Sequence, residues 1–245
     1  ATFDYQALIV TGLNANGFDR NNWVAGGKQG FFEVDNFTSP AYVARLDYRG
    51  VPGLRIGGSF YYCVNTASNS DKVATYAGVK APLRIYTVDG QYKNKYVTAR
   101  TNFVFGNLTG ATAISNKNKG LSNSSPYTRV VQVAKKAVSY AGEVGVNLRS
   151  ICNGNKKVPV IYPFARYEYY NPQEAGEKGQ LPMDKRNQVS MWTAGLNWYA
   201  LPNLVVKADY MTRQIGTGKI FGKGKYNSEN EFSIGIAYVG WFIKK

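Results

Sequence analysis

Hydrophobic and polar side chains alternate with a period of two along the chain, whereas a helical period is hard to find. In segment 42–49, one set of alternate positions holds Tyr42, Ala44, Leu46 and Tyr48, and the other holds Val43, Arg45, Asp47 and Arg49. Segment 54–63 repeats the division after the tight turn at 50–53. Because successive side chains of a strand point to opposite faces, the pattern predicts strands with one apolar and one polar face.

Ten such strands are predicted, at residues 3–12, 39–49, 54–64, 83–92, 96–106, 137–148, 158–170, 187–199, 204–213 and 229–242. Short links at 50–53, 93–95, 149–157 and 200–203 alternate with long polar links at 13–38, 65–82, 107–136, 171–186 and 214–228. Short turns at one end and long loops at the other are typical of outer-membrane barrels. In such barrels about 9–11 residues suffice for a tilted strand to cross the bilayer.

The polarity of the second face favours the same class. On strand after strand it carries Arg, Lys, Asp, Glu, Ser and Gly, whereas the interior of a soluble barrel would be an apolar core. Aromatic residues fall near the predicted strand ends, as in the girdles of membrane barrels: Tyr42, Tyr48, Tyr62, Tyr92, Tyr169, Trp192, Trp198, Tyr238 and Phe242. We therefore predict an all-β chain that forms an antiparallel transmembrane β-barrel of the outer-membrane type. Alternation alone leaves a soluble sandwich, with one solvated face per sheet, as the alternative.

The composition excludes several classes of enzyme. The 245 residues include 30 Lys and Arg, 15 Asp and Glu and no histidine, for a formal charge of +15. Without histidine there is no Ser-His or Cys-His nucleophile pair, no His-ligated zinc and no imidazole base. We expect no enzymatic activity, no metal and no cofactor. The excess of positive charge indicates an anionic partner.

No stretch of about 18 apolar residues is present, so no transmembrane helix is predicted. The two cysteines, Cys63 and Cys152, lack the C-x-x-C spacing of redox and metal motifs. The predicted topology places Cys63 at the outer end of a strand and Cys152 in an inner turn, on the order of 25 Å apart by the height of the apolar band. A disulfide between them is therefore excluded.

Several runs of the sequence are similar to one known family. They are Asp4-Tyr5-Gln6 with residues 12–18, Arg45-Leu46-Asp47-Tyr48-Arg49 with residues 51–57, and residues 162–171, 201–210 and 236–242. Together they resemble the phosphate-selective porin O and P family of Gram-negative outer membranes, and the last three runs resemble its Bacteroidetes branch. The similarity spans nearly the whole chain, with breaks in the long loops, and it lies in signatures of the barrel wall rather than of a selectivity filter.

The resemblance implies a sixteen-stranded, typically trimeric barrel in the bacterial outer membrane, with Arg and Lys in its lumen that guide anions. Residues 1–245 would then be a single transmembrane barrel domain that lacks an N-terminal portion and supplies ten of the strands. The partners it implies are small anions, outer-membrane lipid and lipopolysaccharide, and a homotrimer or a larger outer-membrane complex. A closed ten-stranded barrel, its interior largely filled by side chains, is the alternative.

The alternation along each predicted strand shows which side chains share the polar face, and these are the candidate lumen residues. The cations of the polar face are Arg45, Arg49, Arg55, Arg100, Arg166, Lys207 and Arg213, and the carboxylates are Asp47, Glu143, Glu168 and Asp209. Ion pairs would hold the long side chains upright, and a surplus of cations would leave a positive path for anions. For any single arginine, a paired charge with no part in transport is the alternative.

Two long loops carry cations without acids, namely Lys117, Lys119, Lys135 and Lys136 in 107–136, and Lys219, Lys223 and Lys225 in 214–228. They would form a positive vestibule, bind lipopolysaccharide phosphates, or simply be solvated surface. Taken together, the sequence predicts a passive porin that prefers phosphate or other small anions. The alternatives are a non-conducting barrel that serves as a structural subunit of a larger assembly, and a soluble basic protein that binds nucleic acid.

Overall fold

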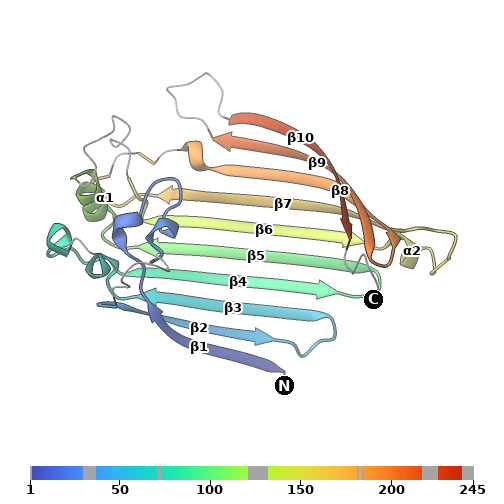
Figure 1. The fold of residues 1–245 in the computed structure, drawn as a ribbon, viewed down its shortest axis with the longest axis horizontal. Coiled ribbons are helices and arrows are strands. Elements are labelled where there is room, and N and C mark those ends of the chain that lie inside the picture. Colours follow the sequence, from blue (N-terminus) through green and yellow to red (C-terminus); the bar gives the residue numbers. More distant parts are fainter. Residues whose placement is uncertain are drawn as a thin grey trace, which may run out of the picture.

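The computed structural model describes residues 2–29, 37–70, 73–120, 132–180, 182–183, 185–216 and 226–238. Ten antiparallel strands form one sheet in chain order (Figure 1). They are β1 (Phe3–Thr11), β2 (Pro40–Tyr48), β3 (Leu54–Cys63), β4 (Leu83–Lys93), β5 (Val97–Leu108), β6 (Lys136–Val146), β7 (Val160–Ala175), β8 (Val189–Leu201), β9 (Leu204–Gly216) and β10 (Tyr226–Tyr238). The prediction of ten antiparallel strands is confirmed.

Short helical segments lie in the connections. They are η1 (Ala15–Gly17), η2 (Ala25–Gly27), η3 (Thr66–Asn69), η4 (Val73–Tyr76), α1 (Ala111–Gly120), α2 (Leu148–Ile151) and η6 (Lys185–Asn187). Within the described ranges, none of the helices has the length and apolar character that a membrane crossing requires. The long connections gather at one end of the sheet, called here the loop end, and the short ones at the other (Figure 1).

Several strand ends lie a few residues from their predicted positions, and the largest difference is at the end of β7. β7 continues to Ala175, although the alternating pattern stops at Asn171 and Pro172. A register shift between Lys136 and Val138 on the neighbouring strand allows the pairing to resume beyond this break. Such an irregularity interrupts the two-residue period locally, so the pattern underestimates the strand.

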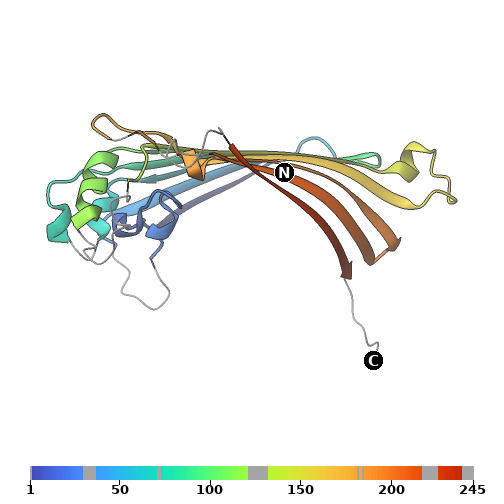
Figure 2. The same ribbon diagram turned by 90° about the horizontal axis from the view of Figure 1, so that it is seen from above.

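The sheet is open along both of its edges. β1 pairs with β2 and β10 pairs with β9, and the described residues show no pairing between β1 and β10. The sheet is curved, and its C-terminal strands β8 to β10 bend away toward one side (Figure 2). The structure therefore shows a curved ten-stranded antiparallel sheet, and closure into a barrel stays a prediction.

The register separates the strands into two faces, as the alternation predicts. One face, called here the apolar face, is formed by residues such as Ile56, Val88, Leu196 and Phe232, and its large hydrophobic side chains are exposed. Trp192 is 61% exposed and Ile236 is 73% exposed. Aromatic rings on this face contact one another between strands, for example Tyr140 with Tyr169 at 4.9 Å and Tyr167 with Trp192 at 4.6 Å between ring centroids.

The opposite face, called here the polar face, carries most of the charged side chains of the strands and is partly covered by the connections of the loop end. There a hydrophobic cluster, called here the loop core, joins wall residues to loop residues. It contains Ala15, Phe18, Trp23, Val24, Ala41, Cys63, Ala67, Tyr76, Ala81, Leu83, Leu108, Ala111, Ile114 and Val133. Burial of these side chains fixes the connections against the wall, because apolar area is removed from water.

The two cysteines are both free, in agreement with the prediction that they form no disulfide. Cys63 is buried at the end of β3, where it contributes to the loop core. Cys152 is exposed directly after α2, in a short connection at the other end of the sheet.

Candidate functional site

Charged side chains cross the polar face as a band from β1 to β10, called here the charged belt. On β2 to β4, Arg45 contacts two carboxylates: Nη2 lies 2.7 Å from Asp47 Oδ1, and Nη1 lies 2.8 Å from Asp89 Oδ2. Arg55 Nη2 reaches the other oxygen of Asp89 at 3.0 Å. Gly57 lies opposite Asp47 in the register, and a Cβ at this position would overlap the Arg45 guanidinium. The absence of a side chain at Gly57 therefore makes room for the ion pair.

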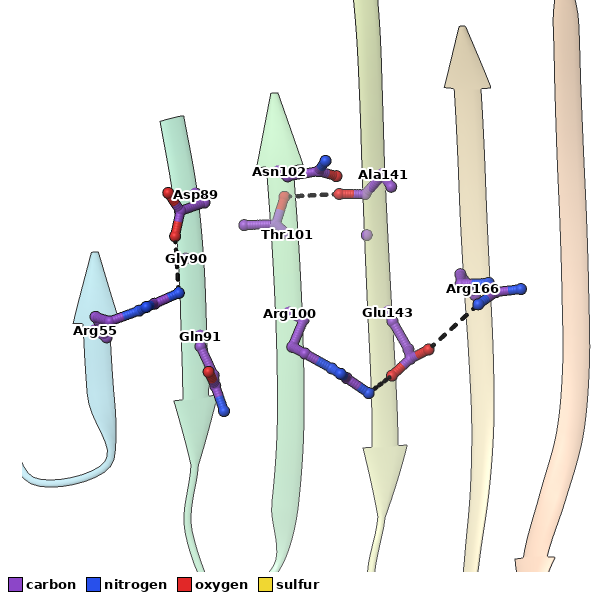
Figure 3. Close-up of a pocket in the computed structure, with 11 residues that line it drawn as sticks. Arg55, Asp89, Gly90, Gln91, Arg100, Thr101, Asn102, Ala141, Glu143 and Arg166 are labelled. Carbon is purple, nitrogen blue, oxygen red and sulfur yellow. Dashed lines mark hydrogen bonds and ion pairs between the residues drawn. The ribbon is translucent and has the colours of Figure 1, made fainter. Parts of the chain in front are cut away.

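A second group of ion pairs lies on β5 to β7 (Figure 3). Arg100 and Arg166 both point toward Glu143, with Arg100 Nη2 at 2.7 Å and Arg166 Nη1 at 4.0 Å from its two oxygens. Arg166 Nε also lies 3.0 Å from Glu168 on the same strand. Three strands are thus joined by one shared carboxylate.

The ends of the belt hold two further pairs. Arg49 Nε lies 2.8 Å from Asp4, and Arg213 Nη1 lies 3.3 Å from Glu229. Lys207, by contrast, makes no ion pair with any described carboxylate. Lys207 and Asp209 line a hollow of about 260 Å³ together with Arg100 and Arg166.

All seven predicted cations and all four predicted carboxylates therefore lie on one face of the sheet, but the expected surplus of cations is not found on the described strands. The cations are Arg45, Arg49, Arg55, Lys93, Arg100, Arg166, Lys207 and Arg213. The carboxylates, equal in number, are Asp4, Asp47, Asp89, Glu143, Glu168, Asp209, Glu229 and Glu231. On the described strands, the polar face is therefore balanced in charge.

Cations and carboxylates of the belt differ in exposure. The side chain of Arg100 is 63% exposed, and that of its partner Glu143 is 23% exposed. Arg45 is 26% exposed, against 11% for Asp47. Arg55 and Arg166 are likewise more exposed than their partners. On β2 to β7 the guanidinium groups therefore extend into solvent, and the carboxylates lie beneath them against the wall.

Sequence reasoning missed Asp89, which joins two of the predicted arginines. The alternation on β4 is ambiguous, because Asp89 shares its face with the hydrophobic Leu83 and Ile85, which the connections of the loop end cover. Asp4 and Glu229 were missed as well, although each is the carboxylate partner of a predicted cation.

The loop lysines are only partly described. Lys117 is exposed on α1, and Lys135 and Lys136 are half-buried at the start of β6. Lys119 belongs to α1, but its side chain lies outside the described residues, as do Lys219, Lys223 and Lys225 altogether. The vestibule therefore stays a prediction.

A metal-binding group of three or more Cys, Asp and Glu side chains is not present among the residues that the structure describes. The expectations that the chain has no cofactor and no enzymatic activity stay predictions. The sequence matches no protein-family model, and no curated protein matches it. The interpretation of the site therefore depends on its geometry.

Proposed function

We propose that this protein is a passive outer-membrane porin with a preference for phosphate or other small anions. The observation that carries the proposal is the contrast between the two faces of the sheet. Large hydrophobic side chains are exposed along one face, and the charged belt crosses the other. A soluble sheet would bury its apolar face against another layer, whereas a barrel in lipid exposes that face and directs polar side chains toward a lumen.

The anion preference follows from where the charges lie rather than from their balance. The exposed guanidinium of Arg100 and the ammonium of Lys207, which has no described ion-pair partner, meet the solvent of the proposed lumen, whereas Glu143 lies closer to the wall. A guanidinium offers two parallel donors to an oxyanion and an ammonium offers a compact charge. Several moderate sites in series also allow an ion to leave, which conduction requires.

Closure of the pore is part of this proposal. The two sheet edges, β1 and β10, carry backbone groups without strand partners among the described residues, and such groups are costly in hydrocarbon. Further strands between these edges would satisfy them, in agreement with a sixteen-stranded barrel of the phosphate-selective porin O and P type. A homotrimer or a larger outer-membrane complex, with lipid and lipopolysaccharide around it, is the assembly we propose.

One observation favours a second candidate, a non-conducting barrel that serves as a structural subunit. The loop core covers the loop end of the polar face and occupies space that a solute would need. A pathway blocked at this level would leave a barrel with a polar interior and no transport.

Planar-bilayer recording of the purified full chain separates the two candidates. We expect channel conductance, and in a KCl gradient a reversal potential whose sign indicates that chloride is more permeant than potassium. Inorganic phosphate on one side should reduce the chloride current, because both anions would use the same guanidinium groups. Absence of conductance would support the structural subunit, and a cation-selective channel would contradict the anion preference.

A further inference from the structure

The connection between β1 and β2 crosses the polar face instead of extending away from the sheet. Its residues 13–29, called here the strap, begin at the edge of the sheet and lie over central strands at the loop end (Figures 1 and 2). At its root, the backbone N–H of Leu13 donates to the Tyr61 hydroxyl at 3.2 Å. At its far side, Asn187 Nδ2 donates to the Arg20 carbonyl at 3.0 Å, directly before β8. The strap therefore spans the polar face from one edge of the sheet nearly to β8.

The tip of the strap is a closed and internally bonded turn. The N–H of Asp19 donates to the Trp23 carbonyl at 2.9 Å, and the Asp19 carboxylate accepts the N–H groups of Asn21 at 2.7 Å and Asn22 at 2.6 Å. A carboxylate that accepts hydrogen bonds from backbone N–H groups of its own turn fixes the shape of that turn. The tip therefore has a defined conformation over the polar face.

The tip is also fixed to the wall. Trp23 is 8% exposed, and its indole Nε1 donates to the Ala134 carbonyl at 2.9 Å. Its ring lies against Gly106 of β5, where a Cβ would overlap the six-membered part of the indole. Buried tryptophan with a satisfied N–H provides both apolar contact and orientation. Gly106 thus forms a notch that holds the ring at the wall.

The middle of the strap rests on α1. Asn118 Nδ2 donates to the Phe18 carbonyl at 3.0 Å and to the Ala15 carbonyl at 3.3 Å, and Tyr76 donates to the amide oxygen of the same asparagine. Between the tip and the wall a hollow of about 200 Å³ remains, lined by Asn21, Asn22 and Trp23 and by residues of β5 to β7. On the strap side, the two asparagines add amide groups to a lining that also includes the Trp23 ring.

We propose that the strap is a fixed constriction that sets the size limit of the pathway, and that docking of Trp23 in the Gly106 notch determines how far the strap extends into it. The proposal depends on the proposed channel function but is independent of the anion preference. The charged belt would select by charge, and the strap, through an uncharged tryptophan and two asparagines near its tip, would select by size.

Swelling of liposomes that contain the full chain measures size selection with uncharged probes. The probes are a pentose, a hexose and a trisaccharide. Trp23→Ala removes the anchor, and Asn187→Ala releases the far side of the tip. In both variants we expect trisaccharide entry, relative to pentose entry, to rise roughly twofold. Gly142→Ala is the matched control, because nothing lies within 4 Å of a Cβ there.

Gly106→Ala provides a coupling test. In the wild-type background the new methyl group displaces the indole, so the size limit changes; in the Trp23→Ala background the same substitution should have no effect. Heat-modifiable migration on electrophoresis confirms that each variant is folded. Folded Trp23→Ala and Asn187→Ala variants with the wild-type size limit would overturn the proposal. A wild-type chain that admits none of the three sugars and conducts no ions would instead remove the proposed channel function.

Discussion

The charged belt and the loop core lie on the same face of the same sheet, yet they meet different surroundings. In the belt, arginines extend into solvent above their carboxylates, and Arg100 is 63% exposed. In the loop core, strand residues of the same polar face, such as Leu83 and Leu108, are completely buried under the connections. The comparison shows that strand parity determines which face a side chain occupies, whereas contacts between distant segments determine what covers it.

The largest effect is expected in the loop core. Ile114→Ala removes a completely buried side chain of α1, and the cavity should cost about 2–5 kcal/mol. Because Ile114 belongs to the loop core, hydrogen exchange should increase in the connections while the strands stay protected. Ile234→Ala, at an exposed position of the apolar face, is the control and should change protection little. Equal loss of protection throughout the sheet would show that the loop core is not a separate unit.

A smaller loss of stability is expected in the belt. Gly57→Ala places a methyl group where the Arg45 guanidinium lies, so the ion pair with Asp47 must shift; because both groups are the ends of flexible side chains, the cost should be about 1 kcal/mol or less. Gly235→Ala, where nothing lies within 4 Å of a Cβ, serves as the control. Thermal unfolding followed by heat-modifiable electrophoresis measures both variants. If they unfold at the same temperature, Gly57 is not required for the geometry of the belt.

Charge substitutions in the belt should change selectivity in opposite directions with little change in stability. Arg100→Gln removes an exposed cation, and the ratio of chloride to potassium permeability should fall roughly twofold. Glu143→Gln removes the carboxylate beneath two arginines, and the ratio should rise. Reversal potentials measure both effects. Arg84→Gln, which removes the same charge from the apolar face near Tyr62, should leave the ratio unchanged.

The smallest effect concerns Tyr76 in the loop core. Burial raises its pKa from about 10 to about 12, since the phenolate is disfavoured away from water. The folded connections therefore retain a proton that the unfolded chain releases near pH 10. The resulting stability is fully present below about pH 10 and is lost as the pH rises toward 12. Proteolysis of the connections should increase over this window, and Tyr76→Phe should reduce the increase. An identical pH dependence in both proteins would contradict the assignment to Tyr76.

The sheet could be predicted from local pattern because each strand repeats the same two-residue period. The number of strands and the division of each strand into two faces follow from this period. So does the position of Arg45, Arg100 and Arg166 on the same face of the sheet. The continuation of β7 to Ala175 could not be predicted, since a register irregularity interrupts the period. Closure of the barrel is a relation between two edges, and no single strand carries a signal for it.

The local sequence pattern also could not predict the part of the site that the connections form. Trp23 docks at Gly106 on β5, and neither residue stands out in its own segment. Asn118 similarly contacts Phe18 although the two residues are far apart along the chain. Such contacts depend on complementary shape after the sheet has formed, whereas alternation reports only which residues share a face.

The proposal that one face meets lipid and the other meets water is tested most directly at two adjacent positions of β8. Leu196 is exposed on the apolar face and Asn197 lies on the polar face. Each is replaced by cysteine in a Cys152→Ser background, where buried Cys63 stays unreactive, and is labelled with an environment-sensitive fluorophore in lipid vesicles. We expect spin-labelled lipid to quench the label at 196 and aqueous iodide to quench the label at 197. Quenching of both labels by iodide alone would contradict the membrane assignment.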